Sequence, residues 1–285
     1  MINIFSILIG CASGNKPAPE DTQNSDICLQ YPIVMAHGIG RNDTGKRMHP
    51  WGRIPEVLQE HGVKVYFGNT DAWGSIESNA ESLKESIDKI LEETEKEKVN
   101  IIAHSKGGID SRYLIWKYDY GDRVASLTTI STPHRGCELA DLLYSKKIIH
   151  TKRGRRRLET FGKLFGDDNP DIYTVSCQLT TENMEKFNDY VTIDERVYYQ
   201  SIYVTMNHPS VDPIFSRSHK YIQGINGAND GLISEYSAKW GPNTLKIADN
   251  ISHEQIIGHG GKKIPGMKIP NIYLDIIRGL GERGL

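Results

Sequence analysis

Short apolar runs alternate with longer amphipathic segments over the first half of the chain. Four of the runs have the length of buried strands: residues 31–35, 63–67, 99–103 and 124–130. Three intervening segments have the length and spacing of helices: residues 50–61, 78–96 and 106–118. Such alternation predicts a mostly parallel sheet flanked by helices, which is an α/β architecture.

The second half of the chain is less regular. Residues 138–188 carry no strand signal and contain a basic cluster, residues 146–157, in which seven of twelve residues are Lys or Arg. This cluster is either a solvated helix face or loop, or a mobile cap that rests on an anionic interface. Residues 197–205 alternate like a strand, residues 221–225 suit another strand, and residues 267–279 suit a closing helix.

Composition narrows the class of protein. The chain has 285 residues, of which 38% are hydrophobic and 25% charged, so it can bury a sizeable core, and no interior linker divides it. Its net charge of −2 provides no field for holding a polyanion, which argues against a nucleic-acid partner. No apolar run reaches the length of about 18 residues that a membrane-spanning helix needs.

The N-terminus differs from the rest of the chain. Residues 1–10 are almost wholly apolar, Cys11 follows, and residues 12–27 are mostly polar, small or proline, a pattern typical of a bacterial lipoprotein signal. We therefore expect residues 1–30 to be a signal-like segment and tether, and residues 31–285 to form the domain. The protein would then be exported, either secreted or lipid-anchored at Cys11. The alternative is a frayed hydrophobic N-terminus or a misassigned start codon.

The four cysteines are too few and too scattered for a disulfide scaffold, and no Cys-x-x-Cys pair suggests zinc. If Cys11 is lipidated, at most one disulfide can form. Its pairing stays open among Cys28, Cys137 and Cys177.

A turn between a predicted strand and a predicted helix carries the strongest chemical signal. The strand ends at Ala103, Ser105 occupies the turn, and Gly107 and Gly108 open the helix. This is the nucleophile elbow, with alanine in the first small position. Small residues are needed there because larger side chains two positions from the serine would collide at so sharp a turn.

A serine hydroxyl needs a base within hydrogen-bond reach and a carboxylate that orients the base. With this elbow, the acid and then the histidine follow the serine along the chain. Asp230 lies in a turn after an apolar run, and His253 follows 23 residues later, so we expect them to be the acid and the base. Four alternatives stay open: Asp212 and Asp249 for the acid, and His219 and His259 for the base.

The tetrahedral intermediate of acyl transfer needs two N–H donors for its oxyanion. One would be the backbone N–H of Lys106, directly after the serine. The other would be the N–H of Ile39, in the loop that follows the first strand. Only the backbone of Lys106 is required, so its side chain can lie in solvent.

Six segments, in this order along the chain, resemble bacterial triacylglycerol lipases of the Pseudomonas and Burkholderia type. The two most distinctive contain Thr-Pro-His-Arg-Gly and Leu-Thr-Thr followed by Phe-Asn. The six are residues 31–38, 103–108, 131–136, 179–188, 229–232 and 239–241.

This resemblance implies the α/β-hydrolase fold and a serine carboxylester hydrolase that cleaves acylglycerols or related esters through an acyl-enzyme. The triad would be Ser105, Asp230 and His253, with a helical lid over about residues 137–190. No organic cofactor is required. A lipid or ester would be the substrate, and the Cys11 anchor or the basic lid would provide contact with a membrane surface.

The family also implies a structural calcium ion near the catalytic histidine. Asp212 matches one acidic ligand, but the second position holds Gln255, and calcium favours charged oxygen ligands. The chain therefore supports a calcium site only weakly.

The same triad could serve a short-chain esterase, a phospholipase, an acyltransferase or a peptidase, because lid and pocket select the substrate. A non-catalytic binding module on this fold is the alternative outside the enzymes. It would usually lack one of the three catalytic positions, all of which have suitable residues here.

Overall fold

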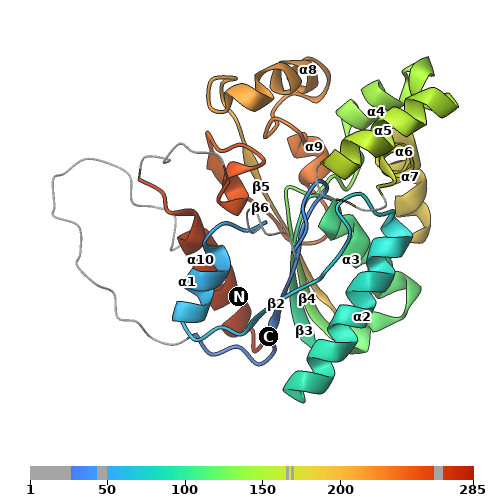
Figure 1. Cartoon of the computed structure of the whole chain (residues 1–285). Helices are drawn as coiled ribbons and strands as arrows, with labels where there is room; N and C mark the ends of the chain where they lie inside the picture. The colour runs from blue at the N-terminus through green and yellow to red at the C-terminus, as the bar shows by residue number, and fades with distance from the viewer. Residues whose placement is uncertain (1–26, 44–49, 165–166, 168–169, 260–265) are drawn as a thin grey trace, which may run out of the picture.

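The computed structural model describes residues 27–43, 50–164, 167, 170–259 and 266–285 (Figure 1). Cys11, and with it most of the predicted lipoprotein-like segment, lies outside the described residues. The domain expected from residue 31 onward is thus described almost throughout.

Six parallel strands form one sheet in the order β2-β1-β3-β4-β5-β6. The predicted mostly parallel sheet flanked by helices is therefore confirmed. The strands are β1 Ile33–Ala36, β2 Val65–Phe67, β3 Val99–His104, β4 Val124–Ile130, β5 Tyr198–Thr205 and β6 Thr244–Asp249.

Helices cover both faces of this sheet (Figure 1). One face packs against α1 Ile54–Glu60 and α10 Ile269–Gly281, and the other against α2 Ile76–Thr94 and α3 Lys106–Lys117. Along β1, Ile33 and Met35 belong to the first core, whereas Val34 and Ala36 belong to the second. Because both faces of the strand are buried, its sequence is a continuous apolar run rather than an alternating one.

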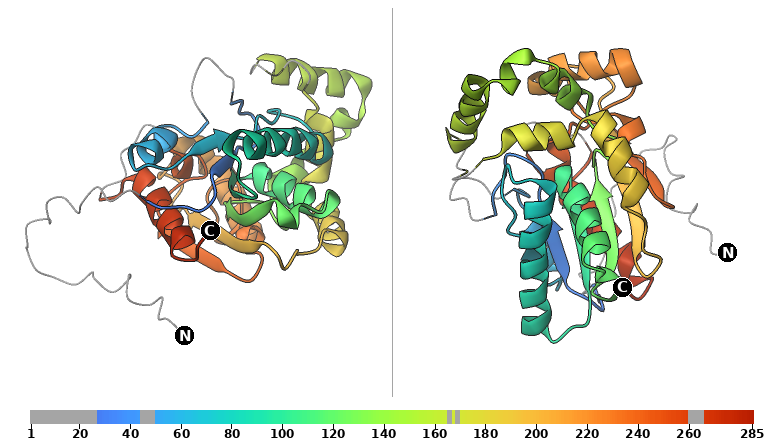
Figure 2. Two further views of the ribbon diagram at one scale, coloured as in Figure 1. Left: turned by 90° about the horizontal axis from the view of Figure 1, so that it is seen from below. Right: turned by 90° about the vertical axis from the view of Figure 1, so that its right-hand side faces the viewer.

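The segment between β4 and β5 is helical and lies at one end of the sheet (Figure 2). Its helices are α4 Glu138–Tyr144, α5 Lys152–Leu164, α6 Ile172–Gln178 and α7 Thr181–Tyr190. The other helices of the described residues are α8 Ser216–Asn226, α9 Glu235–Ala238 and the short 3-10 helices Tyr120–Asp122, Lys147–His150, Pro213–Phe215 and Gln255–Ile257. The absence of strand signals over residues 138–188 is thus explained by helices.

Two elements differ from the sequence-based expectation. The strand predicted at residues 221–225 is wrong, because these residues belong to helix α8, in which His219 and Ile222 are buried. The sequence pattern also missed β6, which pairs with β5 at the edge of the sheet. Most of β6 is exposed or half-buried, so it has no continuous apolar run.

Among the described helices, none is long and apolar enough to cross a membrane. Cys28, Cys137 and Cys177 are free cysteines, so the described part of the chain contains no disulfide. The architecture therefore depends on the two apolar cores that enclose the sheet.

Candidate active site

The turn between β3 and α3 holds Ser105 in a strained conformation. Its φ is 53° and its ψ is −129°, a region that residues other than glycine rarely occupy. The backbone N–H of Ser105 donates to the carbonyl oxygen of Ile130 at the end of β4, with an N–O distance of 2.9 Å. The sheet thereby fixes the strained turn from one side.

Close backbone contacts explain the glycines around this turn. A Cβ atom on Gly107 would lie 2.5 Å from the carbonyl oxygens of Ala36 and His37, and one on Gly38 would lie 2.7 Å from the Cβ of Ser105. No side chain fits at those distances. The carboxyl end of β1 and the start of α3 can therefore approach each other only because Gly38 and Gly107 lack side chains.

Asp230 and His253 meet at the same end of the sheet. His253 Nδ1 lies 2.8 Å from Asp230 Oδ2, and both side chains are buried. The other carboxylate oxygen accepts the backbone N–H groups of Leu232 and Ile233, at 3.0 Å and 2.8 Å. The backbone N–H of His253 donates to the carbonyl oxygen of Asp230. These bonds fix the orientation of the carboxylate and bring the two loops together.

The carboxylate alters the proton affinity of the imidazole. Burial alone lowers the pKa of His253, but the charge of Asp230 and its hydrogen bond outweigh burial and raise the pKa above 6.5. Since Nδ1–H donates to Asp230, the neutral ring carries its free lone pair on Nε2. That nitrogen is therefore the one available to accept a proton.

The four alternative residues are held by other partners in the described chain. Their partners are Ser252 for Asp212, Thr205 and Lys246 for Asp249, the Met206 carbonyl for His219, and the Pro50 carbonyl for His259. Of the acids considered from sequence, Asp230 is the one the structure brings to a histidine.

Ser105 and His253 line one cavity of about 290 Å³. Its other walls are mostly apolar and include Leu139, Leu158 and Val175, contributed by α4, α5 and α6. Among the described contacts, no hydrogen bond joins the Ser105 hydroxyl to His253. Such bonds are often long until a substrate binds. The cavity suits an apolar chain that ends beside a hydroxyl and an imidazole.

The two expected oxyanion donors have no acceptor among the described residues. Within the described residues, neither the N–H of Ile39 nor that of Lys106 donates to a protein acceptor. Lys106 is the first residue of α3, where helix N–H groups have no intrahelical acceptor and carry partial positive charge. Both residues adjoin Gly38 or Ser105, which line the cavity.

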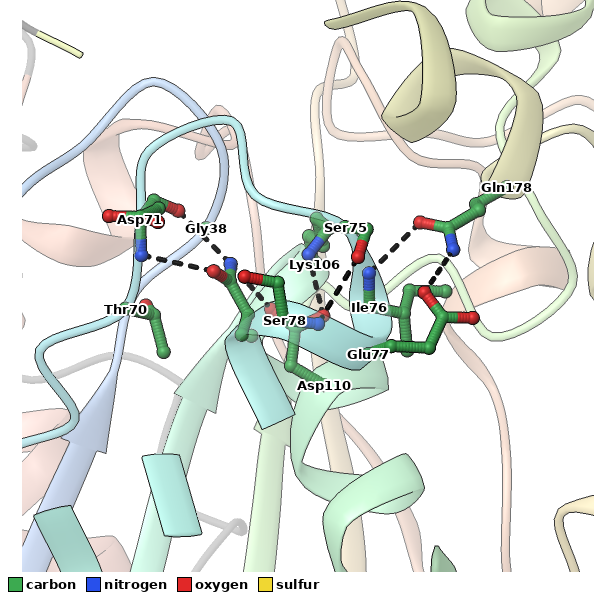
Figure 3. A network of polar contacts seen from close by, with 12 residues as sticks. Gly38, Thr70, Asp71, Ser75, Ile76, Glu77, Ser78, Lys106, Asp110 and Gln178 are labelled. Atoms are coloured by element: carbon green, nitrogen blue, oxygen red, sulfur yellow. Dashed lines mark hydrogen bonds and ion pairs between the residues drawn. The ribbon is translucent and has the colours of Figure 1, made fainter. Parts of the chain in front are cut away.

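The expectation that the Lys106 side chain lies in solvent is wrong. This side chain is only 2% exposed, and its Nζ lies 2.6 Å from Asp110 Oδ1, one turn later on α3 (Figure 3). Burial raises the pKa of Asp110, while the charge of Lys106 and bonds from Lys106 and Asn79 oppose that rise. The sequence shows the four-residue spacing of the pair but not that α2 packs against α3 and buries it.

His104, directly before the serine, is a site residue that the sequence reasoning missed. Its Nε2 lies 3.1 Å from the carbonyl oxygen of His253, and the two ring centroids are 4.5 Å apart. Burial lowers the pKa of His104 well below 6.5, so the ring is neutral and Nε2–H is the donor. This bond holds the backbone of His253. In the sequence, only the position of His104 directly before Ser105 could have indicated that His104 belongs to the site.

Three of the lipase-like segments meet around Trp240. His134 stacks on Trp240 with ring centroids 4.8 Å apart, and its carbonyl oxygen accepts from the Asn188 side chain. Arg112 donates to Asn188 and lies 3.8 Å from the Trp240 ring centroid. His134, Asn188, Arg112 and Trp240 therefore join α3, α7 and the loop after β4.

The residues considered for calcium do not fit a calcium ion. Asp212 uses one carboxylate oxygen for the Ser252 hydroxyl, at 2.8 Å, and the other for the N–H of Ile214. Gln255 Oε1 accepts the N–H of Ser252, at 2.9 Å. No group of three or more acidic, histidine or cysteine side chains in the described chain is arranged for a metal. These bonds hold the loop of His253 directly.

Comparison with known proteins supports the family resemblance. A family model described as palmitoyl protein thioesterase matches residues 32–191. Triacylglycerol lipase 2 of Saccharomyces cerevisiae is 33% identical over 214 residues, which are 70% of this chain and 60% of that protein. The triacylglycerol lipase of Burkholderia plantarii is 38% identical over 171 residues, or 56% and 47% of the two chains. The resemblance to triacylglycerol lipases is thus confirmed, and the chain spans about half to three fifths of these relatives.

Solved structures confirm the α/β-hydrolase fold. Staphylococcus hyicus lipase superposes with a TM-score of 0.72 at 19% identity, covering 93% of this chain and 98% of that one. The mature lipase of Bacillus licheniformis gives a TM-score of 0.62 at 21% identity, covering 88% and 91%. At such identities the likeness concerns the fold.

The Asp230 carboxylate should control the titration of His253. In NMR titrations of the His253 ring, we expect a pKa above 6.5 in the wild type. In Asp230→Asn the pKa should fall below 6.5, because burial remains while the favourable charge is lost. Asp249→Asn is the control and should leave it unchanged. Equal values in the wild type and in Asp230→Asn would contradict this account.

Calcium should not stabilise the fold. We expect EDTA and millimolar calcium to leave the Tm unchanged, whereas Ser252→Ala should cost about 1–3 kcal/mol because it removes the hydroxyl that donates to the buried Asp212 Oδ2. Ser82→Ala on α2 provides the control. A clear fall of the wild-type Tm in EDTA, reversed by calcium, would show that a calcium site exists.

Proposed function

Because the chain belongs to the palmitoyl protein thioesterase family, whose model matches residues 32–191, we propose that it is a serine hydrolase that cleaves carboxylic esters of fatty acids. The observation that supports this most is the Asp230–His253 hydrogen bond beside a strained serine in an apolar cavity. The names of the curated relatives favour acylglycerols or related esters as substrates.

The proposed reaction begins when His253 Nε2 accepts the proton of Ser105, whose oxygen attacks the ester carbonyl carbon. The negative oxygen of the tetrahedral intermediate accepts the N–H groups of Ile39 and Lys106. His253 then gives its proton to the departing alcohol, which leaves an acyl-enzyme on Ser105. Water, deprotonated by His253, attacks that ester, and His253 returns the proton to the Ser105 oxygen as the fatty acid leaves. Asp230 stabilises the positive imidazole in both halves of the reaction.

A thioester is the second candidate substrate, because the family description names a thioesterase. Oxygen esters and thioesters give the same acyl-enzyme and differ only in the leaving group. A phospholipase or an acyltransferase would also share this intermediate, since leaving group and acyl acceptor distinguish them. We propose the oxygen ester on the basis of the curated relatives.

We propose that residues 137–190 act as a lid that meets an anionic lipid surface. Leu158 and Phe161 of α5 line the cavity, and Phe161 is 49% exposed. Most basic side chains of this helix are exposed: Lys152, Arg153, Arg155, Arg156 and Arg157. A helix with an apolar side at the cavity and cations in solvent suits an anionic interface.

The proposed location is outside the cytoplasm, with the protein secreted or held by a lipid on Cys11. The support is the apolar segment before Cys11 and the polar residues after it. Export would bring the basic lid to an external lipid surface.

Ser105→Ala should lower kcat for p-nitrophenyl esters at least about 1,000-fold without loss of folding, because it removes the nucleophile. Ser82→Ala on α2 is the control and should match the wild type. Retention of more than a few per cent of turnover in Ser105→Ala would contradict the proposed nucleophile.

For one acyl chain, kcat/KM should be higher for the oxygen ester than for the coenzyme A thioester.

The triple variant Arg153→Gln/Arg156→Gln/Arg157→Gln should bind vesicles of phosphatidylcholine with phosphatidylglycerol at least tenfold more weakly. Each basic residue near an anionic surface contributes about 1 kcal/mol. Binding to phosphatidylcholine alone should not change.

The control for this experiment removes the same charge from exposed lysines outside the lid: Lys64→Gln/Lys89→Gln/Lys117→Gln. Equal binding of the two triple variants to anionic vesicles would contradict a role for the basic lid.

A further inference from the structure

Lys106, whose backbone N–H is one of the proposed oxyanion donors, has its side chain in a buried ion pair with Asp110. The Lys106 and Asp110 side chains are 2% and 1% exposed, and Nζ and Oδ1 are 2.6 Å apart (Figure 3). Burying two charges costs free energy that their attraction only partly offsets. The pair also fixes the first turn of α3, whose first amide is the N–H of Lys106.

Asp110 connects this pair to the first turn of α2. Its second carboxylate oxygen accepts Asn79 Nδ2, at 3.2 Å. The Asn79 amide also brackets the backbone of Asp71, since Oδ1 accepts the Asp71 N–H and Nδ2 donates to the Asp71 carbonyl oxygen, both at 3.0 Å. Asn79 is buried, so these bonds are shielded from water. The ion pair is thereby joined to the loop before α2.

The same loop holds the segment that carries the other donor. His37 Nε2 lies 3.1 Å from the Thr70 carbonyl oxygen, and the Gly40 N–H donates to the Ala72 carbonyl oxygen at 2.9 Å. These two bonds flank Ile39 on either side. One set of contacts therefore reaches both proposed donors, from α3 at one end and from the loop after β1 at the other.

The lid segment also bonds to this loop. The Trp73 N–H donates to Asp167, and the Trp73 carbonyl oxygen accepts the Asp171 N–H. Gln178 of α6 accepts the Ile76 N–H at 2.9 Å (Figure 3). The loop is thus held from three sides, which limits its movement relative to the turn at Ser105.

We propose that Asp110, through the Lys106 side chain, and Asn79, through the loop at Asp71, are positioning residues that set the separation of the Lys106 and Ile39 amides. The inference rests on the proposed function, because it assigns both amides to the oxyanion. Hydrogen bonds to a developing charge depend steeply on position: loss of one donor costs about 100- to 1,000-fold in kcat, and a misplacement of about 1 Å can cost about 100-fold.

The test is the double variant Lys106→Met/Asp110→Leu. It keeps the Lys106 N–H and replaces the buried pair with apolar side chains of similar size, a change that buried ion pairs often tolerate. The matched control is Lys84→Met/Asp88→Leu, which removes an ion pair of the same i,i+4 spacing from the half-buried face of α2. The measurements are kcat and KM for a p-nitrophenyl ester, Ki for an alkylboronic acid, and the Tm.

We expect the double variant to fold and to lose about 10- to 100-fold in kcat, with KM within about threefold of wild type. The Ki of the boronic acid should rise by a similar factor, because its tetrahedral adduct uses the same donors. The acid limb of the pH profile, set by His253, should not move. A kcat within twofold of the control variant would overturn the proposal, as would a loss that appears in KM with no change in Ki.

If the double variant does not fold, Asn79→Ser reaches the network from its other end. We expect a kcat loss in the same direction with KM preserved, and an unchanged kcat would overturn the proposal. A wild-type protein without ester turnover would instead contradict the proposed function. Wild-type turnover that is equal in all folded variants would contradict only the positioning network.

Discussion

The strained backbone of Ser105 is the constraint on which the rest of the site depends. A conformation with φ of 53° and ψ of −129° costs about 1–3 kcal/mol, so the surrounding structure must enforce it. The bond to Ile130 and the contact of Gly107 with β1 do so. Strands β1, β3 and β4 therefore have to end at matching positions, and their buried register supplies that match.

Around this turn, buried charges occur with partners. Asp230 faces His253, and Lys106 faces Asp110, so neither carboxylate is left without compensation. The first pair raises the proton affinity of an imidazole, and the second anchors a helix that begins beside the serine. His104, neutral because it is buried, and Ser252 then fix the loop of His253 from two sides. Polar groups thus hold the geometry, while the cavity beside them is apolar.

The sequence predicted the parts of the fold that are buried on both faces. A continuous apolar run marked β1, because both of its faces are buried, and mostly apolar runs marked β2, β3 and β4. The edge strand β6 has no such run and was therefore missed. The apolar residues at 221–225 fit a helix as well as a strand, so the strand predicted there was wrong. Chain order after Ser105, the turn that holds Asp230 and the resemblance to lipases selected Asp230 and His253. The burial of Lys106 could not be predicted, since it depends on how α2 packs against α3.

A crystal structure of the protein treated with an alkyl fluorophosphonate would test the central claim most directly. The account predicts phosphorus bonded to Ser105 Oγ, with the phosphoryl oxygen within about 3 Å of the Ile39 and Lys106 amide nitrogens and His253 Nε2 facing the serine oxygen. The alkyl group should lie in the apolar cavity. Phosphorus on another residue, or a phosphoryl oxygen that contacts neither amide, would contradict it.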